Sequence, residues 1–258
     1  MKYTIFTPTY NREKDLEILY NSLKAQTLQN FEWLIIDDGS TDQTERIVDS
    51  FKKENVFPIR YIRQNNGGKH RAFNRAIEES KGEFLVCVDS DDYLKEYALE
   101  KIEELSHLSD KVMALCFLCV DEKGKVIGTP FPKNNSIFNL IDLTYKYKVR
   151  GDKLWIFRSS ILKKYKFPEY EGEKFVTEGV LLFKMALNYD ILVSNESLQI
   201  HEYKHGGLTS IGNNSLFKKS PKGAKAYYKM LLQVAPNYKY KLFYFYNYTL
   251  YSFCRRKK

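Results

Sequence analysis

Three carboxylates that follow one strand-like segment constrain this chain more than any other feature. The apolar run 84–88 is typical of a buried strand, and it leads directly to Asp89, Asp91 and Asp92. Carboxylates gathered at one strand end repel one another and destabilise the folded state unless a cation is bound among them. Mg²⁺ and Mn²⁺ prefer carboxylate oxygens and often bridge them to a diphosphate. The segment therefore predicts a metal–nucleotide site, with an acidic turn that caps a helix as the alternative.

Strand and helix patterns alternate from the first residues to about residue 105. We expect strands at 3–7, 31–36, 59–62 and 84–88, and helices at 13–26, at 69–79 and from a cap at Thr41 or Asp42 through Phe51. This alternation predicts a parallel, doubly wound α/β sheet, in which ligands bind beyond the carboxyl ends of the strands. Polar groups fall at three such ends, namely Pro8-Thr9-Tyr10, Asp37-Asp38 and Asp89-Ser90-Asp91.

The pattern is less regular after residue 105. We expect strands at 112–120, 125–129 and 154–157, and helices from Ser159 or Ser160, at 177–187 and at 217–232, the last being basic and amphipathic. Residues 130–150 fit no single pattern, and the segment 238–253 is aromatic throughout. The chain is long enough for one large α/β domain with a small appendage.

The net charge of +9 is distributed unevenly along the 258 residues. Residues 203–258 carry 12 Lys and Arg, no Asp or Glu, and 13 Tyr and Phe, whereas residues 1–202 carry 29 basic and 32 acidic side chains, a net charge of −3. A basic, aromatic C-terminal extension suits an anionic membrane surface. A homo-oligomer interface is the alternative, because 242–253 is a large apolar surface to leave exposed. No recognition motif accompanies the charge, so nucleic acid is not an expected partner.

The cysteines and the N-terminus indicate an intracellular protein. Cys116 and Cys119 have CxxC spacing, but a strand would place their side chains on opposite faces, and no second Cys or His pair accompanies them. We therefore expect neither a zinc site nor a disulfide framework. No signal peptide and no apolar stretch of about 18 residues is visible, so the expected location is the cytoplasm.

With these motifs in place, the chain resembles the family 2 glycosyltransferases, which are inverting sugar transferases of GT-A fold. The resemblance is specific over residues 1–100 and weaker over 150–210. The residues that carry it are Thr7-Pro8-Thr9-Tyr10-Asn11-Arg12, Asp37-Asp38-Gly39-Ser40-Thr41-Asp42, Asn66-Gly67-Gly68 with Ala72 and Asn74, Gly82-Glu83-Phe84, Asp89-Ser90-Asp91-Asp92, Phe167-Pro168, residues 173–178 and Gly207-Leu208-Thr209.

The resemblance implies a fold and a division of the chain. The fold is α/β, a GT-A (Rossmann-like) mostly parallel central sheet flanked by helices, to which this sequence adds a basic aromatic helical extension. Residues 1–105 would form the half of the domain that binds a nucleotide sugar. Residues 106–212 would form the acceptor-binding and catalytic half, and residues 213–258 the C-terminal extension.

The resemblance also implies a nucleotide-diphosphate sugar as donor, with a UDP-sugar favoured, and Mn²⁺ or Mg²⁺ as cofactor. The nucleotide-binding residues would be Pro8, Thr9, Tyr10, Arg12, Asp38, Asn66, Gly68, Lys69, Asp89 and Ser90, and the metal ligands Asp91 and His205. A carboxylate such as Asp38 can accept the N–H of a uracil-like base. Lys69 can stabilise the charge of the departing diphosphate, with a merely solvated lysine as the alternative. His70 and Arg71 face either the diphosphate or solvent.

Catalysis requires a base for the acceptor hydroxyl. Much of the family has an acidic pair at the start of a helix, but here the pair reads Glu178-Gly179. The base is therefore expected to be Glu178, with Glu173 and Asp152 in reserve. The alternative is that Glu178 only favours the dipole of a helix that Thr177 caps. His201 and His205 precede a late loop, and of the two His205 is the better candidate for the metal.

These observations lead to one functional interpretation and two rivals. The chain is expected to be a metal-dependent inverting glycosyltransferase, peripheral at the inner face of the plasma membrane, that acts on a glycan or lipid-linked glycan acceptor in surface polysaccharide synthesis. The first rival is a catalytically silent relative that binds a nucleotide sugar as a regulator or scaffold. The second, a sugar-phosphate nucleotidyltransferase, would be expected to have a Gly-rich basic loop after its first strand, and Pro8-Thr9-Tyr10-Asn11-Arg12 is not such a loop.

Overall fold

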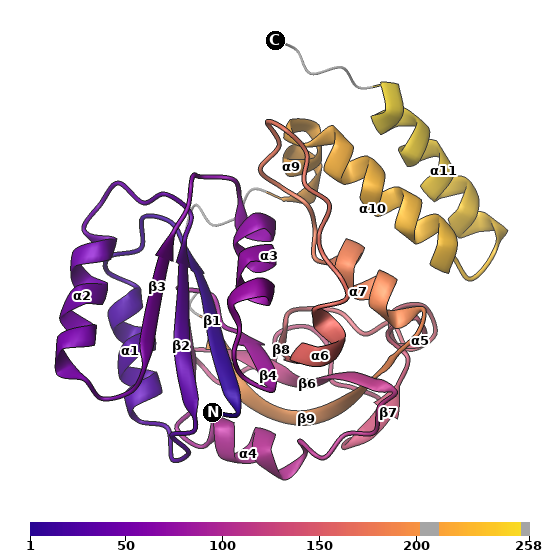
Figure 1. The fold of residues 1–258 in the computed structure, drawn as a ribbon. Coiled ribbons are helices and arrows are strands. Elements are labelled where there is room, and N and C mark those ends of the chain that lie inside the picture. The colour runs from indigo at the N-terminus through magenta and orange to yellow at the C-terminus, as the bar shows by residue number, and fades with distance from the viewer. Residues whose placement is uncertain (202–211, 254–258) are drawn as a thin grey trace.

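Four parallel strands form the first part of a mixed sheet, in the order β3-β2-β1-β4 (Figure 1). Their bounds are Tyr3–Thr9 (β1), Phe31–Asp37 (β2), Ile59–Arg63 (β3) and Phe84–Cys87 (β4). The structure, a computed structural model, describes residues 1–201 and 212–253. The strands predicted from the sequence in this part are all present, and the predicted fold class is confirmed.

Helices cover both faces of these parallel strands. α1 (Leu16–Lys24), α2 (Thr44–Glu54) and α4 (Ala98–Glu104) pack on one face, and α3 (Lys69–Glu79) packs on the other (Figure 1). The apolar stripe of α1 explains its position, because its four apolar residues at helical spacing are all buried against the sheet: Leu16, Leu19, Tyr20 and Leu23. Regular βα units thus bring the carboxyl ends of β1, β2 and β4 to one edge of the sheet.

The second part of the sheet consists of strands that lie far apart in the sequence. β8 (Lys153–Arg158) pairs antiparallel with β4, and the order continues through β6 (Val112–Asp121) and β9 (Asp190–His201) to β5 (Asp92–Leu94). β7 (Ser136–Phe138) also pairs with β9, which makes nine strands within the described residues. Short helices connect these strands, namely α5 (Leu140–Tyr145), α6 (Ser159–Leu162) and α7 (Gly179–Ala186).

β6 is buried on both faces, which explains its continuous apolar sequence. Cys116 contributes to the hydrophobic cluster on the α3 face and Cys119 to the cluster on the α1 face. Both thiols are free. The CxxC spacing therefore places the two side chains on opposite sides of the sheet, as expected.

Four sequence expectations need correction beyond the parallel strands. The predicted strand 125–129 is reduced to a single bridge between Val120 and Val126, beyond the turn at Gly124. β5, β7 and β9 have no counterpart among the predicted strands. The predicted helix 217–232 is interrupted at Ser220, because Pro221 starts a new helix. Thr177 does not cap α7: Glu178 occupies the N-cap position and makes no side-chain capping bond.

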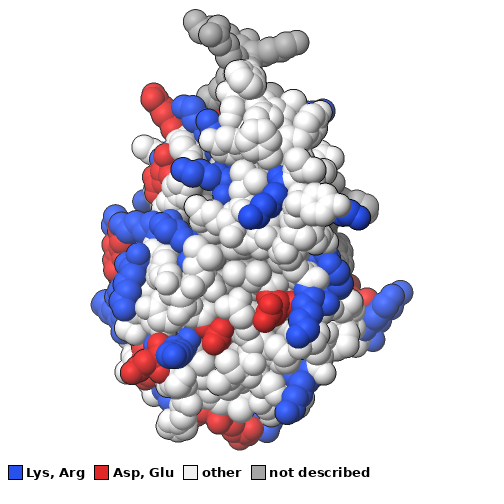
Figure 2. Space-filling model, turned by 90° about the vertical axis from the view of Figure 1, so that its right-hand side faces the viewer, with Lys and Arg blue, Asp and Glu red and all other residues white. Residues whose placement is uncertain are grey.

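The C-terminal extension consists of α9 (Asn213–Lys219), α10 (Pro221–Val234) and α11 (Tyr238–Phe253). α10 packs against α7 of the body on one side and against α11 on the other. The outer side of α11 leaves large apolar side chains exposed, and this end of the molecule is mostly uncharged with scattered Lys side chains (Figure 2). No helix among the described residues is both long and apolar enough to cross a bilayer.

Candidate functional site

A cavity of about 1270 Å³ lies at the carboxyl ends of β1, β2 and β4 and extends under α7. Its wall includes every predicted site residue in the described part of the chain: Pro8, Thr9, Tyr10, Arg12, Asp38, Asn66, Gly68, Lys69, Asp89, Ser90, Asp91 and Glu178. His205 lies outside the described residues. The structure therefore gathers residues from sequence motifs up to 170 positions apart around one space.

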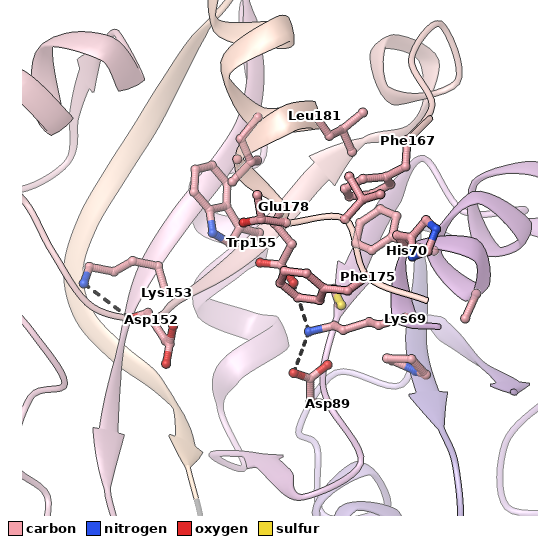
Figure 3. A pocket seen from close by; sticks show the side chains of 18 of the residues that line it. Lys69, His70, Asp89, Asp152, Lys153, Trp155, Phe167, Phe175, Glu178 and Leu181 are labelled. Atoms are coloured by element: carbon pink, nitrogen blue, oxygen red, sulfur yellow. Dashed lines mark hydrogen bonds and ion pairs between the residues drawn. The ribbon is translucent and has the colours of Figure 1, made fainter. Parts of the chain in front are cut away.

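Lys69 joins the two sides of this cavity (Figure 3). Its ammonium group lies 2.7 Å from an oxygen of Asp89 after β4 and 2.9 Å from an oxygen of Glu178 before α7. Burial alone would lower the pKa of Lys69, but the charges of Asp89 and Glu178 outweigh it and raise that pKa well above its usual value. A permanent cation is thus held between the acidic end of β4 and the predicted base.

Asp38 organises the glycine loop that precedes α3. Its carboxylate accepts hydrogen bonds from the backbone N–H groups of Gly67 (2.9 Å) and Gly68 (2.7 Å) and from the side-chain amide of Gln64 (2.8 Å). Gly68 has a φ of +94°, and any Cβ there would collide with the carbonyl oxygen of Lys174. Glycine at position 68 therefore lets the loop lie directly against the backbone at Lys174, in the second half of the domain.

Asp89 and Asp91 retain oxygens that can bind a cation. Oδ1 of Asp89 is buried without a hydrogen-bond partner within the described residues. Asp91 lies 3.5 Å from the guanidinium of Arg12, and burial and the charge of Asp89 raise the pKa of Asp91. No cluster of three His, Cys, Asp or Glu suited to a metal exists in 1–201 and 212–253. Two carboxylates still fit Mg²⁺ or Mn²⁺, because such ions take further ligands from substrate phosphates and water.

The third carboxylate of the acidic segment has other partners. Asp92 is buried at the start of β5, where its oxygens lie 3.2 Å from Nδ1 of His201 and 2.8 Å from the side-chain amide of Gln199. Burial and the charges of Asp89 and Asp91 raise the pKa of Asp92 to about 9. Asp92 and His201 thus form a contact between β5 and β9, and this contact supports the floor of the cavity.

The three candidate bases differ in their surroundings. Glu178 has half of its side chain exposed and points into the cavity (Figure 3). Glu173 is buried, and both of its oxygens accept backbone N–H groups at the start of α10, from Lys222 (3.0 Å) and Gly223 (2.9 Å). Because those bonds occupy its carboxylate, Glu173 is a structural cap for α10. Asp152 lines the cavity and remains the alternative to Glu178.

Sequence patterns did not identify several residues of the cavity wall. Trp155 on β8, Phe175 before α7 and Tyr227 on α10 all line the cavity. Trp155 lies in an apolar strand and Tyr227 on the amphipathic helix, where aromatic residues are ordinarily core, and Phe175 is a single aromatic residue between Lys174 and Val176. Only the tertiary structure therefore reveals their position.

His70 faces neither the solvent nor a charged partner. It is 3% exposed, its ring contacts that of Phe167 edge-on, and neither ring nitrogen has a partner among the described residues. Burial, assisted by Arg71, lowers the pKa of His70 to about 4, so the ring is neutral near pH 7. The solvated position that the sequence left open for His70 is therefore wrong.

Comparison with known proteins identifies the family. The model of the family described as "Glycosyl transferase family 2" matches residues 4–166. The poly(ribitol-phosphate) beta-N-acetylglucosaminyltransferase TarS of Staphylococcus aureus (strain Mu50) is 33% identical over 167 residues. That alignment covers 63% of this chain but only 28% of the relative, so the matched region spans under a third of that protein's length.

Solved structures agree with this assignment. The crystal structure of S. aureus TarS 1-349 in complex with UDP-GlcNAc has a TM-score of 0.72 at 25% identity, and the match covers 100% of this chain and 74% of that one. A mannosyltransferase from Pyrobaculum calidifontis, solved with GDP-Man and Mn²⁺, shares the fold with a TM-score of 0.63 at 15% identity, over 97% of this chain and 73% of that one. The family match and the cavity lead to the same conclusion: the chain belongs to glycosyl transferase family 2.

Proposed function

We propose that this protein is a metal-dependent, inverting glycosyltransferase that moves a sugar from a UDP-sugar to a hydroxyl group of a glycan or lipid-linked glycan. The observation that carries the proposal is Lys69, held between Asp89 on the donor side and Glu178 on the acceptor side of one cavity. A transferase needs a cation near the leaving diphosphate and a base near the attacking hydroxyl, and this arrangement supplies both.

The donor side is assigned from the ends of the parallel strands. Pro8 and Thr9, which end β1, and Tyr10 directly after it hold the nucleoside, with the exposed ring of Tyr10 available to stack on the base. Asp38 positions the glycine loop and offers its remaining acceptor capacity to the N–H of the base. The relative TarS was solved with UDP-GlcNAc, which supports a UDP-sugar as donor.

Asp91, with the unpartnered oxygen of Asp89, would hold Mn²⁺ or Mg²⁺ beside the diphosphate. Such an ion supplies a Lewis acid that neutralises charge on the leaving group. Lys69 contributes positive charge to the same leaving group from the start of α3, and Arg12 balances the negative charge of Asp91.

On the acceptor side, Glu178 accepts the proton of the attacking hydroxyl. Its position at the N-terminus of α7 and its half-exposed carboxylate leave it accessible to a hydroxyl in the cavity. The hydroxyl attacks the anomeric carbon from the face opposite the diphosphate, so the configuration at that carbon inverts.

The C-terminal extension is proposed to hold the enzyme at an anionic membrane surface. α11 exposes Leu242, Phe245, Tyr246 and Phe253, and residues 212–253 contain no acidic side chain to repel lipid phosphates. Sedimentation with phosphatidylglycerol vesicles, but not with phosphatidylcholine vesicles, is the expected result. Concentration-dependent dimerisation without vesicle binding would instead assign the same face to self-association.

Calorimetric titration tests the core of the proposal. UDP, GDP, CDP and dTDP are each titrated with and without Mn²⁺ into the wild type and Asp91→Asn. UDP binding that Mn²⁺ strengthens in the wild type, and that Asp91→Asn abolishes, is the expected result. Binding by none of the four would contradict the proposed donor site. Nucleotide binding without transfer to any acceptor would favour the silent relative, and turnover with any acceptor would exclude it.

A further inference from the structure

The C-terminal extension forms part of the cavity wall, through three contacts with residues 173–179. Glu173 caps the first turn of α10 with two charge-assisted hydrogen bonds. Gly223, on the same turn, lies so close to the carbonyl oxygen of Phe175 that any side chain would collide with it. One turn further along α10, Tyr227 lies against Gly179. The extension is thus fixed to the segment that carries Glu178.

Tyr227 occupies the space beside the predicted base. A Cβ atom at position 179 would lie 2.8 Å from Cε2 of Tyr227, closer than real Cβ contacts. The absence of a side chain at Gly179 therefore allows the ring to approach the backbone next to Glu178. Where much of the family has a second acid, this chain instead brings in an aromatic ring from a different part of the sequence.

Trp155 provides a second aromatic surface in the same cavity. Its indole stacks on the ring of Phe157 at a centroid distance of 5.6 Å and an interplanar angle of 6°, which fixes its orientation. Trp155 and Glu178 both lie on the wall of this cavity (Figure 3). Trp155 and Tyr227 thus both line the cavity that holds Glu178, and we call these two rings its aromatic end.

The chemistry of this aromatic end selects a class of ligand. Burial raises the pKa of Tyr227 to about 12, so its phenol is a neutral hydrogen-bonding group and not a base. Aromatic side chains with a polar tip bind ligands that present both C–H surfaces and hydroxyl groups. A pyranose ring has both, whereas an open-chain polyol phosphate lacks a rigid C–H face.

We propose that Trp155 and Tyr227 form an acceptor subsite that binds a pyranose ring and presents its hydroxyl to Glu178. The inference rests on the proposed glycosyl transfer, and it assigns α10 of the C-terminal extension a direct part in acceptor selection. The acceptor is accordingly a sugar-terminated glycan or glycolipid.

Saturation-transfer NMR tests this subsite with simple glycosides in place of the natural acceptor. The probes are the p-nitrophenyl β-glycosides of glucose, galactose and N-acetylglucosamine, with ribitol 5-phosphate as the open-chain comparison, each in the presence of UDP and Mn²⁺. We expect saturation of pyranose ring protons in the wild type and weak or no transfer to ribitol 5-phosphate.

Substitutions of Tyr227 and Tyr228 test where the pyranoside binds. Tyr227→Ala should lower the affinity for the tightest-binding pyranoside by about 2- to 10-fold. Tyr227→Phe, which keeps the ring, should retain most of that affinity. The matched control is Tyr228→Ala, because Tyr228 lies on the same helix but stacks on Tyr251 of α11 at 5.8 Å and does not line the cavity.

Two results would overturn the subsite while leaving the proposed function intact. One is normal UDP binding by calorimetry with no pyranoside binding, or with ribitol 5-phosphate binding equally well. The other is equal loss of pyranoside affinity in Tyr227→Ala and Tyr228→Ala, which would reduce Tyr227 to a packing residue. If UDP itself does not bind, the proposed function fails first and the subsite fails with it.

Discussion

The two halves of the domain reach the same cavity by different routes. In residues 1–105, β1, β2 and β3 are each followed directly by a helix, and the polar residues at the carboxyl ends of β1, β2 and β4 meet because parallel strands end at one edge. In residues 106–253, the wall is assembled from β8, the segment before α7 and α10, which are neighbours only in the folded chain. The proposed donor side is therefore encoded by local motifs, whereas the proposed acceptor side depends on long-range packing.

Glu178→Gln separates the two halves most sharply. Loss of the base should lower transfer by about 10²- to 10⁴-fold, while UDP binding on the donor side stays within about twofold of the wild type. Initial rates of UDP release and calorimetry measure the two effects. The control is Glu171→Gln, an exposed acid on the same segment. Unchanged transfer in Glu178→Gln would move the base assignment to Asp152.

Gly68→Ala tests the point where the halves touch. The change strains a residue with φ of +94° and forces a collision with Lys174, so we expect a loss of about 3 kcal/mol in unfolding free energy together with weaker UDP binding. Gly124→Ala is the matched control, since Gly124 has a φ of +78° but a Cβ added there would meet nothing within 4 Å. Urea unfolding gives the comparison. Equal losses in both variants would mean that strain alone, without the contact between halves, explains the effect.

His70 gives the donor half a pH dependence. The folded pKa is lowered to about 4 from 6.5, so the unfolded state binds more protons between these values, and stability is lost as the pH falls from about 6.5 toward 4. The loss attributable to His70 is up to about 3 kcal/mol. Unfolding free energies of the wild type and His70→Phe across this range measure it, with the exposed His107→Gln as control. Parallel pH profiles for the wild type and His70→Phe would contradict the assignment.

Glu173→Gln tests how firmly the C-terminal extension is attached to the rest of the domain. Replacing the charged cap of α10 by an amide keeps one acceptor oxygen and should cost about 1–2 kcal/mol. Limited proteolysis should then cleave α10 and α11 before the body. Donor binding should be unaffected, because Glu173 does not line the cavity. Proteolysis that begins in the parallel half would show that the extension is not the weaker unit.

The sequence predicted the parallel half well because its signals are local. α1 was evident from Leu16, Leu19, Tyr20 and Leu23 at helical spacing, and α3 was predicted with the bounds that it has in the structure. β9 was missed because polar residues, Ser194-Asn195-Glu196, interrupt its apolar pattern where its register against β6 shifts. β5 is three residues long and follows the acidic turn directly, so no periodicity could identify it.

The candidate site divides in the same way. Residues predicted on the donor side line one cavity because each belongs to a motif at a strand end. Trp155 and Tyr227 could not be found in this way, because an aromatic residue in an apolar strand or helix is ordinarily core. The capping role of Glu173 likewise depends on an N-terminal turn 49 residues further along the chain.

The position of β8 in the sheet affects how the chain can fold while it is being synthesised. β8 is inserted between β4 and β6, although it is made after both. Until about residue 158 has left the ribosome, β4 remains an open strand edge with unpaired backbone groups, a surface that favours aggregation. The parallel half therefore cannot complete its sheet as an independent unit during synthesis, and a fragment that ends near residue 105 is expected to need a chaperone to stay in solution.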